Sequence, residues 1–146
     1  MTSWQRACDP RLGRRGFCVA SLVAASALVA PIAWGGSYLD RAALLVTQAS
    51  REANYLRARL ADLELARTVQ KLAAARLKAA STMQVPKEVA QAHPHLLLML
   101  ENYERAADAA RGGKQERFFE FVTRARNEEG ILRGVLKQLG WPLPKV

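Results

Sequence analysis

The stretch from Ser37 to Ala80 contains neither glycine nor proline, and this limits the folds open to the chain more than any other feature. Glycine and proline are the residues that most often interrupt a helix. We therefore predict one long helix over residues 37–80, with a length of about 65 Å at 1.5 Å per residue. Ser37 and Asp40 have the spacing of a capping box at its start.

Apolar residues recur at steps of three and four through the first part of this helix. They are Leu39, Ala42, Val46, Ala49, Ala53, Leu56, Leu60 and Leu63. A repeat of 3.5 residues indicates a helix that supercoils against another helix, in the same chain or in another copy. We call this set the heptad seam and predict that it is an interface. Beyond Leu63 the register fails at Arg67 and Gln70, which indicates a change of partner helix or a phase slip.

Two shorter helices are predicted after the long one, over residues 94–111 and 114–139. Gly112 and Gly113 separate them, and a two-residue turn makes two helices antiparallel. No run of alternating apolar and polar residues predicts a strand. The predicted fold is therefore all-α, with a long N-terminal helix packed through part of its length against a helical hairpin. Residues 36–146 form one domain in this interpretation.

The first 35 residues have a different character from the rest. Four arginines (Arg6, Arg11, Arg14 and Arg15) precede an uncharged run over residues 17–33. Positive charge before an apolar run is typical of a signal peptide or of a membrane anchor, and the length of this run fits either. Both predict that residues 36–146 lie in the periplasm, free or anchored to the inner membrane. The alternative is a buried helix of a cytoplasmic protein.

A short motif in this segment resembles the twin-arginine export signal. It consists of Arg14, Arg15, Gly16, Phe17, Cys18 and Val19. The resemblance implies export of a folded protein. Both cysteines of the chain, Cys8 and Cys18, also lie here, so a chain cleaved near Gly36 would contain no disulfide.

Basic residues exceed acidic ones throughout the chain, which has a formal net charge of +9. Residues 1–35 contribute four arginines and Asp9, so the remainder keeps a net charge of +6. Its cations are not interleaved with aromatic residues and match no nucleic-acid-binding motif, so we do not expect nucleic acid as a partner. Anionic lipid and acidic cell-wall polymers are the charged partners that this composition favours.

Candidate metal ligands are few. His93 and His95 are the only histidines, and the hairpin register places His95 level with Glu129 and Leu97 level with Glu128. These two histidines and Glu129 form a conceivable metal site or haem site, although their spacing matches no compact ligand motif. A solvent-exposed helix start is the alternative explanation, and we predict no cofactor.

Two further features lie on the predicted helices. Glu104, Glu128 and Glu129 interrupt apolar faces, and we expect salt bridges for them rather than acid–base chemistry, because no nucleophile accompanies them. Gly130 and Gly134 have small-xxx-small spacing on the face opposite the apolar stripe of residues 114–139. That face is a candidate second contact surface.

The sequence therefore predicts a non-enzymatic helical scaffold protein of the cell envelope. It would bind a protein partner, or another copy of itself, through the heptad seam. One alternative is an exported helical bundle that binds a metal or haem through His93 and His95. Another is a small basic periplasmic chaperone.

Overall fold

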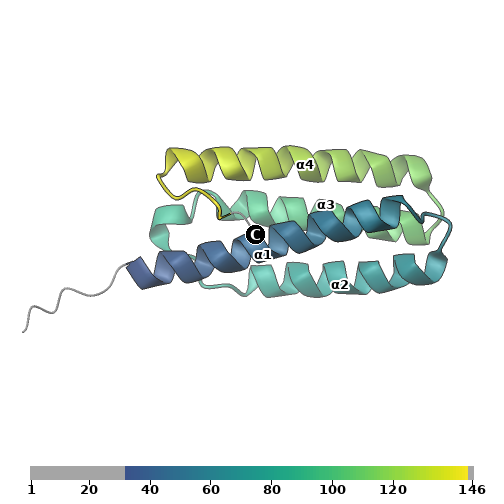
Figure 1. Cartoon of the computed structure of the whole chain (residues 1–146), viewed down its shortest axis with the longest axis horizontal. Coiled ribbons are helices and arrows are strands. Elements are labelled where there is room, and N and C mark those ends of the chain that lie inside the picture. The colour runs from purple at the N-terminus through teal and green to yellow at the C-terminus, as the bar shows by residue number, and fades with distance from the viewer. Residues whose placement is uncertain (1–31, 145–146) are drawn as a thin grey trace, which may run out of the picture.

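A computed structural model of the protein describes residues 32–144, and this part of the chain is all-helical. The elements are α1 (Ile32–Arg57), α2 (Leu63–Ser81), a short 3-10 helix η1 (Lys87–Val89), α3 (His93–Arg111) and α4 (Gln115–Gln138) (Figure 1). The predicted all-α class is confirmed for the described residues. The predicted signal or anchor segment lies outside them up to residue 31, as do Cys8, Cys18 and the twin-arginine-like motif.

The prediction of one continuous helix over residues 37–80 is wrong, because a turn at residues 58–62 divides it into α1 and α2. The Arg59 amide donates to the Leu56 carbonyl, and the Asp62 amide donates to the Arg59 carbonyl, each at 2.9 Å. Asp62 then caps α2, since its side chain accepts from the Leu65 amide at 2.9 Å. The heptad pattern therefore continues through the turn at Leu60 and Leu63, and it fails only inside α2, where the chain has already reversed.

The predicted start at Ser37 is also wrong. The backbone is already helical from Ile32, so α1 passes through Gly35 and Gly36. A glycine inside a helix costs about 1 kcal/mol relative to alanine but leaves the backbone hydrogen bonds intact, so it does not have to end the helix.

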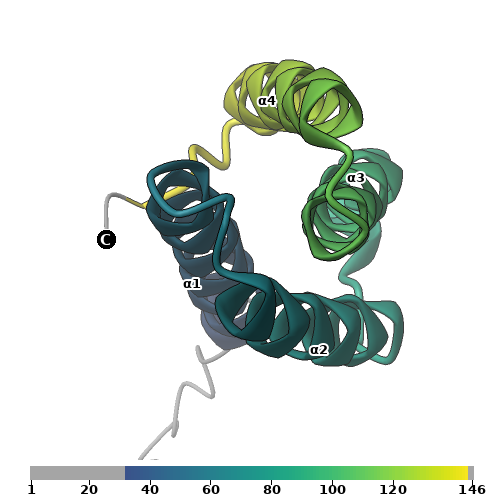
Figure 2. The same cartoon turned by 90° about the vertical axis from the view of Figure 1, so that its right-hand side faces the viewer.

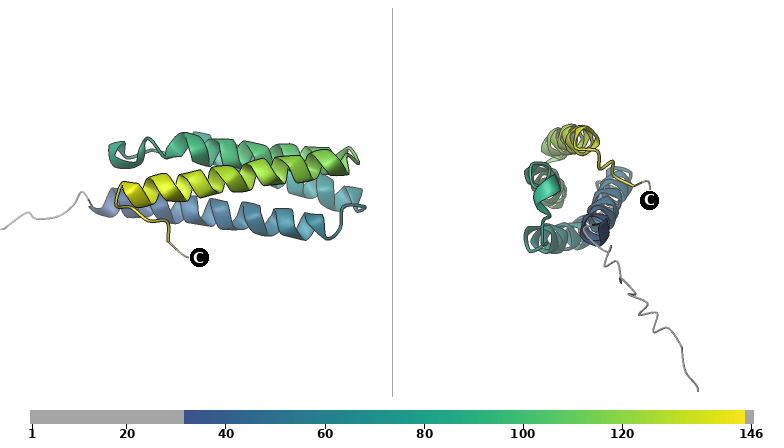
Figure 3. Two further views of the ribbon diagram at one scale, coloured as in Figure 1. Left: turned by 90° about the horizontal axis from the view of Figure 1, so that it is seen from above. Right: turned by 90° about the vertical axis from the view of Figure 1, so that its left-hand side faces the viewer.

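The four helices run up, down, up and down along one axis (Figures 1 and 3). Viewed along that axis, they are placed around a common centre in chain order (Figure 2). The closest packing joins α3 to α2 and to α4, and α1 lies against α2 and α3. Among the helices that are neighbours around the bundle, α1 and α4 have the fewest close backbone approaches. The architecture of the described residues is a four-helix bundle.

The core is built from leucines with many alanines between them. Ala66, Ala73 and Ala80 recur every seven residues on the buried face of α2, and Ala106, Ala107 and Ala110 are buried on α3. Small side chains let helix backbones approach closely. The largest fully buried side chains are Phe118, Leu56, Leu96, Met99, Leu100, Leu132 and Leu136.

The hairpin predicted over residues 94–111 and 114–139 is confirmed to within one residue at each end. Lys114 donates its amide to the Ala109 carbonyl at 2.8 Å, which closes the end of α3. Gly113 has φ +69°, a left-handed conformation that glycine adopts at little cost. The two-glycine turn is thus what reverses the chain.

Replacing the cap of α2 tests whether this turn is held by Asp62. We expect Asp62→Ala to lower the free energy of unfolding by about 1 kcal/mol, because the Leu65 amide loses its acceptor. Asp40→Ala is the matched control, and it should change stability by less than about 0.5 kcal/mol, as for other exposed sites. Urea unfolding of both variants makes the comparison, and equal losses would contradict the assignment.

Candidate functional site

The heptad seam lies mainly inside the core of this chain. Leu39, Val46, Ala49, Ala53 and Leu56 are between 0% and 8% exposed. Leu60 is half-buried in the turn, whereas Leu63 is 47% exposed at the start of α2. The seam residues of α1 therefore pack within the bundle, and a second molecule could reach them only if α1 moved away from it.

The two glycines of the candidate second contact surface are exposed on α4. A Cβ atom added at Gly130 or Gly134 would meet nothing within 4 Å among the described residues. Neither glycine is therefore required by close packing within the described bundle.

His93 connects the start of α3 to α1. Its Nδ1 atom lies 3.1 Å from the Tyr38 hydroxyl, and the two rings are tilted with centroids 5.9 Å apart. Burial raises the pKa of Tyr38 to about 12, so the phenol keeps its proton and donates to Nδ1 in the tautomer that leaves this nitrogen unprotonated. Burial also lowers the pKa of His93, which favours the neutral ring.

His95 faces a different helix. Its Nδ1 atom lies 2.9 Å from Oε2 of Glu128 on α4, one residue from the predicted neighbour Glu129. Glu129 instead accepts a hydrogen bond from Nε of Arg133 at 2.9 Å, and Nη2 of the same arginine lies 2.8 Å away in an ion pair. His93, His95 and Glu129 thus have three separate partners. The predicted metal set is not assembled, and residues 32–144 contain no group of three or more His, Cys, Asp or Glu placed to hold a metal ion.

Glu104 does not form the predicted salt bridge; its carboxylate accepts a hydrogen bond from the uncharged Gln70 side chain on α2 at 2.9 Å. Gln70 is one of the residues at which the heptad register failed. Its polar position is explained by this link between α2 and α3.

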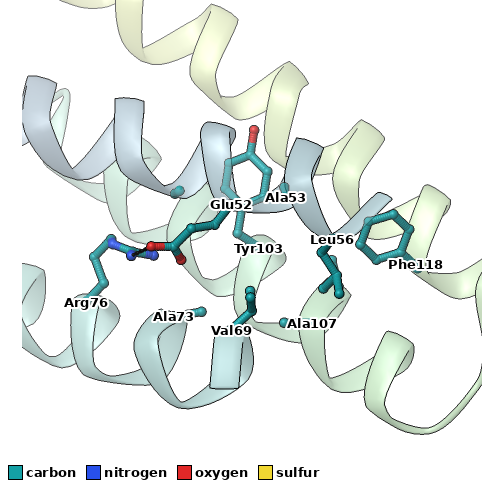
Figure 4. A pocket seen from close by; sticks show the side chains of 11 residues that line it. Glu52, Ala53, Leu56, Val69, Ala73, Arg76, Tyr103, Ala107 and Phe118 are labelled. Atoms are coloured by element: carbon teal, nitrogen blue, oxygen red, sulfur yellow. Dashed lines mark hydrogen bonds and ion pairs between the residues drawn. The ribbon is translucent and has the colours of Figure 1, made fainter. Parts of the chain in front are cut away.

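A buried ion pair joins α1 to α2 in the middle of the bundle (Figure 4). Nη2 of Arg76 lies 2.5 Å from Oε1 of Glu52; the Arg76 side chain is 8% exposed and the Glu52 side chain is 27% exposed. This pair was not predicted from the sequence. The signal that could have found it is position, since Arg76 continues the buried stripe of Ala66, Val69, Ala73 and Ala80.

Beside the ion pair lies a small cavity lined by alanines of α1, α2 and α3 together with Leu56, Val69 and Phe118. Its volume is ≈ 10 Å³, about the space that one water molecule needs. The Oε2 atom of Glu52 has no hydrogen-bond partner among the described residues. A water bound there would satisfy it, and this cavity has no room for an organic substrate.

The Tyr103 hydroxyl is the second buried polar atom without a partner among residues 32–144. It points away from the ion pair (Figure 4). Burial raises the pKa of Tyr103, and the neighbouring Ser50 and Arg126 side chains offset only part of this rise. The phenol therefore stays protonated and neutral at physiological pH.

Comparison of the chain with protein-family models, with curated proteins and with solved structures finds no match. Among the described helices, none is both long enough and apolar enough to cross a membrane. The function of this chain is therefore inferred from its own residues.

Removing one member of the ion pair should cost more than removing both. We expect Arg76→Met to lower the free energy of unfolding by about 2 to 3 kcal/mol, because Glu52 keeps its charge without a cation beside it. Arg76→Met with Glu52→Met should recover most of that loss, since neither charge then remains in the bundle. Chemical denaturation of the single and double variants measures the coupling. Additive losses would show that the two side chains act independently.

The His93 environment predicts a pH dependence of stability. The pKa of His93 is lower in the folded state than the usual 6.5, so unfolding takes up a proton once the pH falls below about 6.5. The free energy of unfolding should therefore decrease from pH 7.5 toward pH 5.5. His93→Asn should flatten this decrease, and it should do so equally in a His95→Asn background. Unfolding at a series of pH values tests this, and an unchanged profile in His93→Asn would exclude His93 as the cause.

Proposed function

We propose that this chain is a non-enzymatic helical protein of the cell envelope, exported or anchored in the inner membrane, that binds a partner protein by helix-to-helix contact. The N-terminal arginines and the uncharged run over residues 17–33 support the location. The run leads directly into α1, so α1 would be the helix nearest the membrane or the cleavage site.

The observation that carries the proposal is a second line of residues along the outside of α1. Leu44, Gln48, Arg51 and Tyr55 follow one another at steps of four, three and four, so they lie on one face of the helix. Leu44 is 46% exposed and Tyr55 is 52% exposed. We call these four residues the outer stripe. Because the heptad seam is occupied within the bundle, the outer stripe is the face of α1 open to another helix.

The chemistry of the outer stripe suits a protein contact. The Arg59 guanidinium lies 4.1 Å from the centre of the Tyr55 ring, which stacks a cation on an exposed aromatic side chain. Tyrosine and arginine are enriched where protein interfaces contribute most binding energy. An amphipathic partner helix with acidic residues beside its apolar face would complement Leu44, Tyr55 and the neighbouring arginines.

Cations elsewhere on the bundle fit acidic surroundings. Lys71, Lys78, Lys87, Lys114, Arg117 and Lys137 form no ion pair with a described residue. Their attraction to anionic lipid or to wall polymer would be screened by salt. In this proposal the electrostatic attraction only brings the protein to acidic surroundings, and the outer stripe recognises the partner protein.

Site-directed photo-crosslinking in cells tests the outer stripe. A photoreactive residue at Gln48 should give one discrete adduct, whereas the same residue at the exposed Thr123 on α4 should not. Leu44→Glu with Tyr55→Glu should reduce the Gln48 adduct by at least about tenfold, because two charges then face the partner's apolar side. Leu98→Glu is the matched control at an exposed leucine of α3, and it should leave the adduct unchanged.

The same strains carry a control for location, in which alkaline phosphatase fused after Val146 should be active. An adduct of twice the mass of this chain would identify a second copy as the partner. Equal adducts in the stripe variant and the control would refute the outer stripe, and an inactive fusion would refute the envelope location.

A further inference from the structure

The chain reverses direction once more after α4. Leu139 is the C-cap residue of α4, and Gly140, which follows it, has φ +81°. The Trp141 amide donates to the Leu136 carbonyl at 2.9 Å, and the Gly140 amide donates to the Lys137 carbonyl at 3.1 Å. A left-handed glycine with these two bonds closes the helix and turns the chain back along the bundle.

The residues after this turn cross from α4 to the first half of α1, a path that all views show (Figures 1, 2 and 3). Trp141 and Leu143 are half-buried and pack against the core. Pro142 and Pro144 alternate with them and restrict the backbone, which lowers the entropy lost when this segment is fixed in place. We call residues 140–144 the C-terminal strap.

The strap crosses the edge of the bundle at which neighbouring helices approach least, between α1 and α4. Two other contacts span this edge. Nη2 of Arg126 donates to Oδ1 of Asn54 at 2.9 Å, and the Arg57 guanidinium lies 5.8 Å from the centre of the Phe119 ring. Both contacts involve the last turns of α1, close to the turn at residues 58–62. Toward the start of α1, the Tyr38–His93 contact links the helix to α3, and the strap links it across this edge to α4.

We propose that the C-terminal strap holds the first half of α1 in the bundle, and that its release frees α1 together with its heptad seam. The seam residues Leu39, Ala42 and Val46 lie in that half and are buried in the closed bundle. Freed, they would extend the helix-binding surface that begins at the outer stripe. The binding of a partner helix by the freed seam rests on the proposed function, whereas the attachment of α1 by the strap does not.

Hydrogen exchange of the full chain, without any partner, tests the strap. In Trp141→Ala with Leu143→Ala, amides between Leu39 and Val46 should exchange about tenfold faster, because local opening of α1 becomes easier. Amides between Leu100 and Ala107 on α3 should keep their rates. Ile131→Ala removes a comparable apolar side chain from the exposed side of α4 and should leave the rates in α1 unchanged.

Gly140→Ala provides an independent variant that deletes no core contact. A Cβ atom at this position would meet nothing within 4 Å among the described residues, so the substitution acts only through the left-handed backbone. Gly140→Ala should also accelerate amide exchange between Leu39 and Val46 but not on α3, and the acceleration should be smaller than in the double variant. It tests the role of the strap if the double variant does not fold. Unchanged exchange in α1, or an equal increase in α1 and α3, overturns the strap. Because this readout needs no partner, it can fail while crosslinking at Gln48 succeeds, and the reverse also holds.

Discussion

The arrangement of the described helices depends on the turn at residues 58–62, and the hydrogen bond between the Asp62 carboxylate and the Leu65 amide helps to close that turn. This hydrogen bond satisfies a backbone donor at the start of α2 and so allows a helix to begin anew after a turn of five residues. Without that turn, residues 37–80 would form a rod with an apolar stripe that only another molecule could cover. With it, the two halves of the rod lie side by side and the stripe is covered from within.

Inside the bundle, the many alanines and the Glu52–Arg76 pair act together. Alanines let α2 approach α3 closely, but they specify little about how far one helix is shifted along the next. The ion pair adds that information, because it is satisfied only when α1 and α2 are aligned so that the two side chains meet. We infer that Arg76 is kept in a buried position for alignment more than for stability, a use of buried charge known from other helical assemblies.

The features that could be predicted from the sequence are those next to a strong local signal, such as a pair of glycines. Gly112 and Gly113 make the hairpin of α3 and α4 visible, and the His95 contact was placed within one residue because that turn sets the register. The turn at residues 58–62 contains no glycine or proline, so only Asp62 points to it. The Glu52–Arg76 pair could not be predicted, because it joins two helices and the sequence predicts a single helix over residues 37–80. For the same reason, the seam was proposed as an interface with another molecule, whereas its α1 residues are buried within the described bundle.

The even number of helices places the start of α1 and the end of α4 at the same end of the molecule (Figure 1). The turn at residues 58–62 and the turn at Gly112 and Gly113 lie at the other end. With 26 residues in α1, the two ends are about 39 Å apart. In an anchored chain standing upright on the bilayer, both turns would be held well beyond the lipid headgroups while the strap stayed close to them.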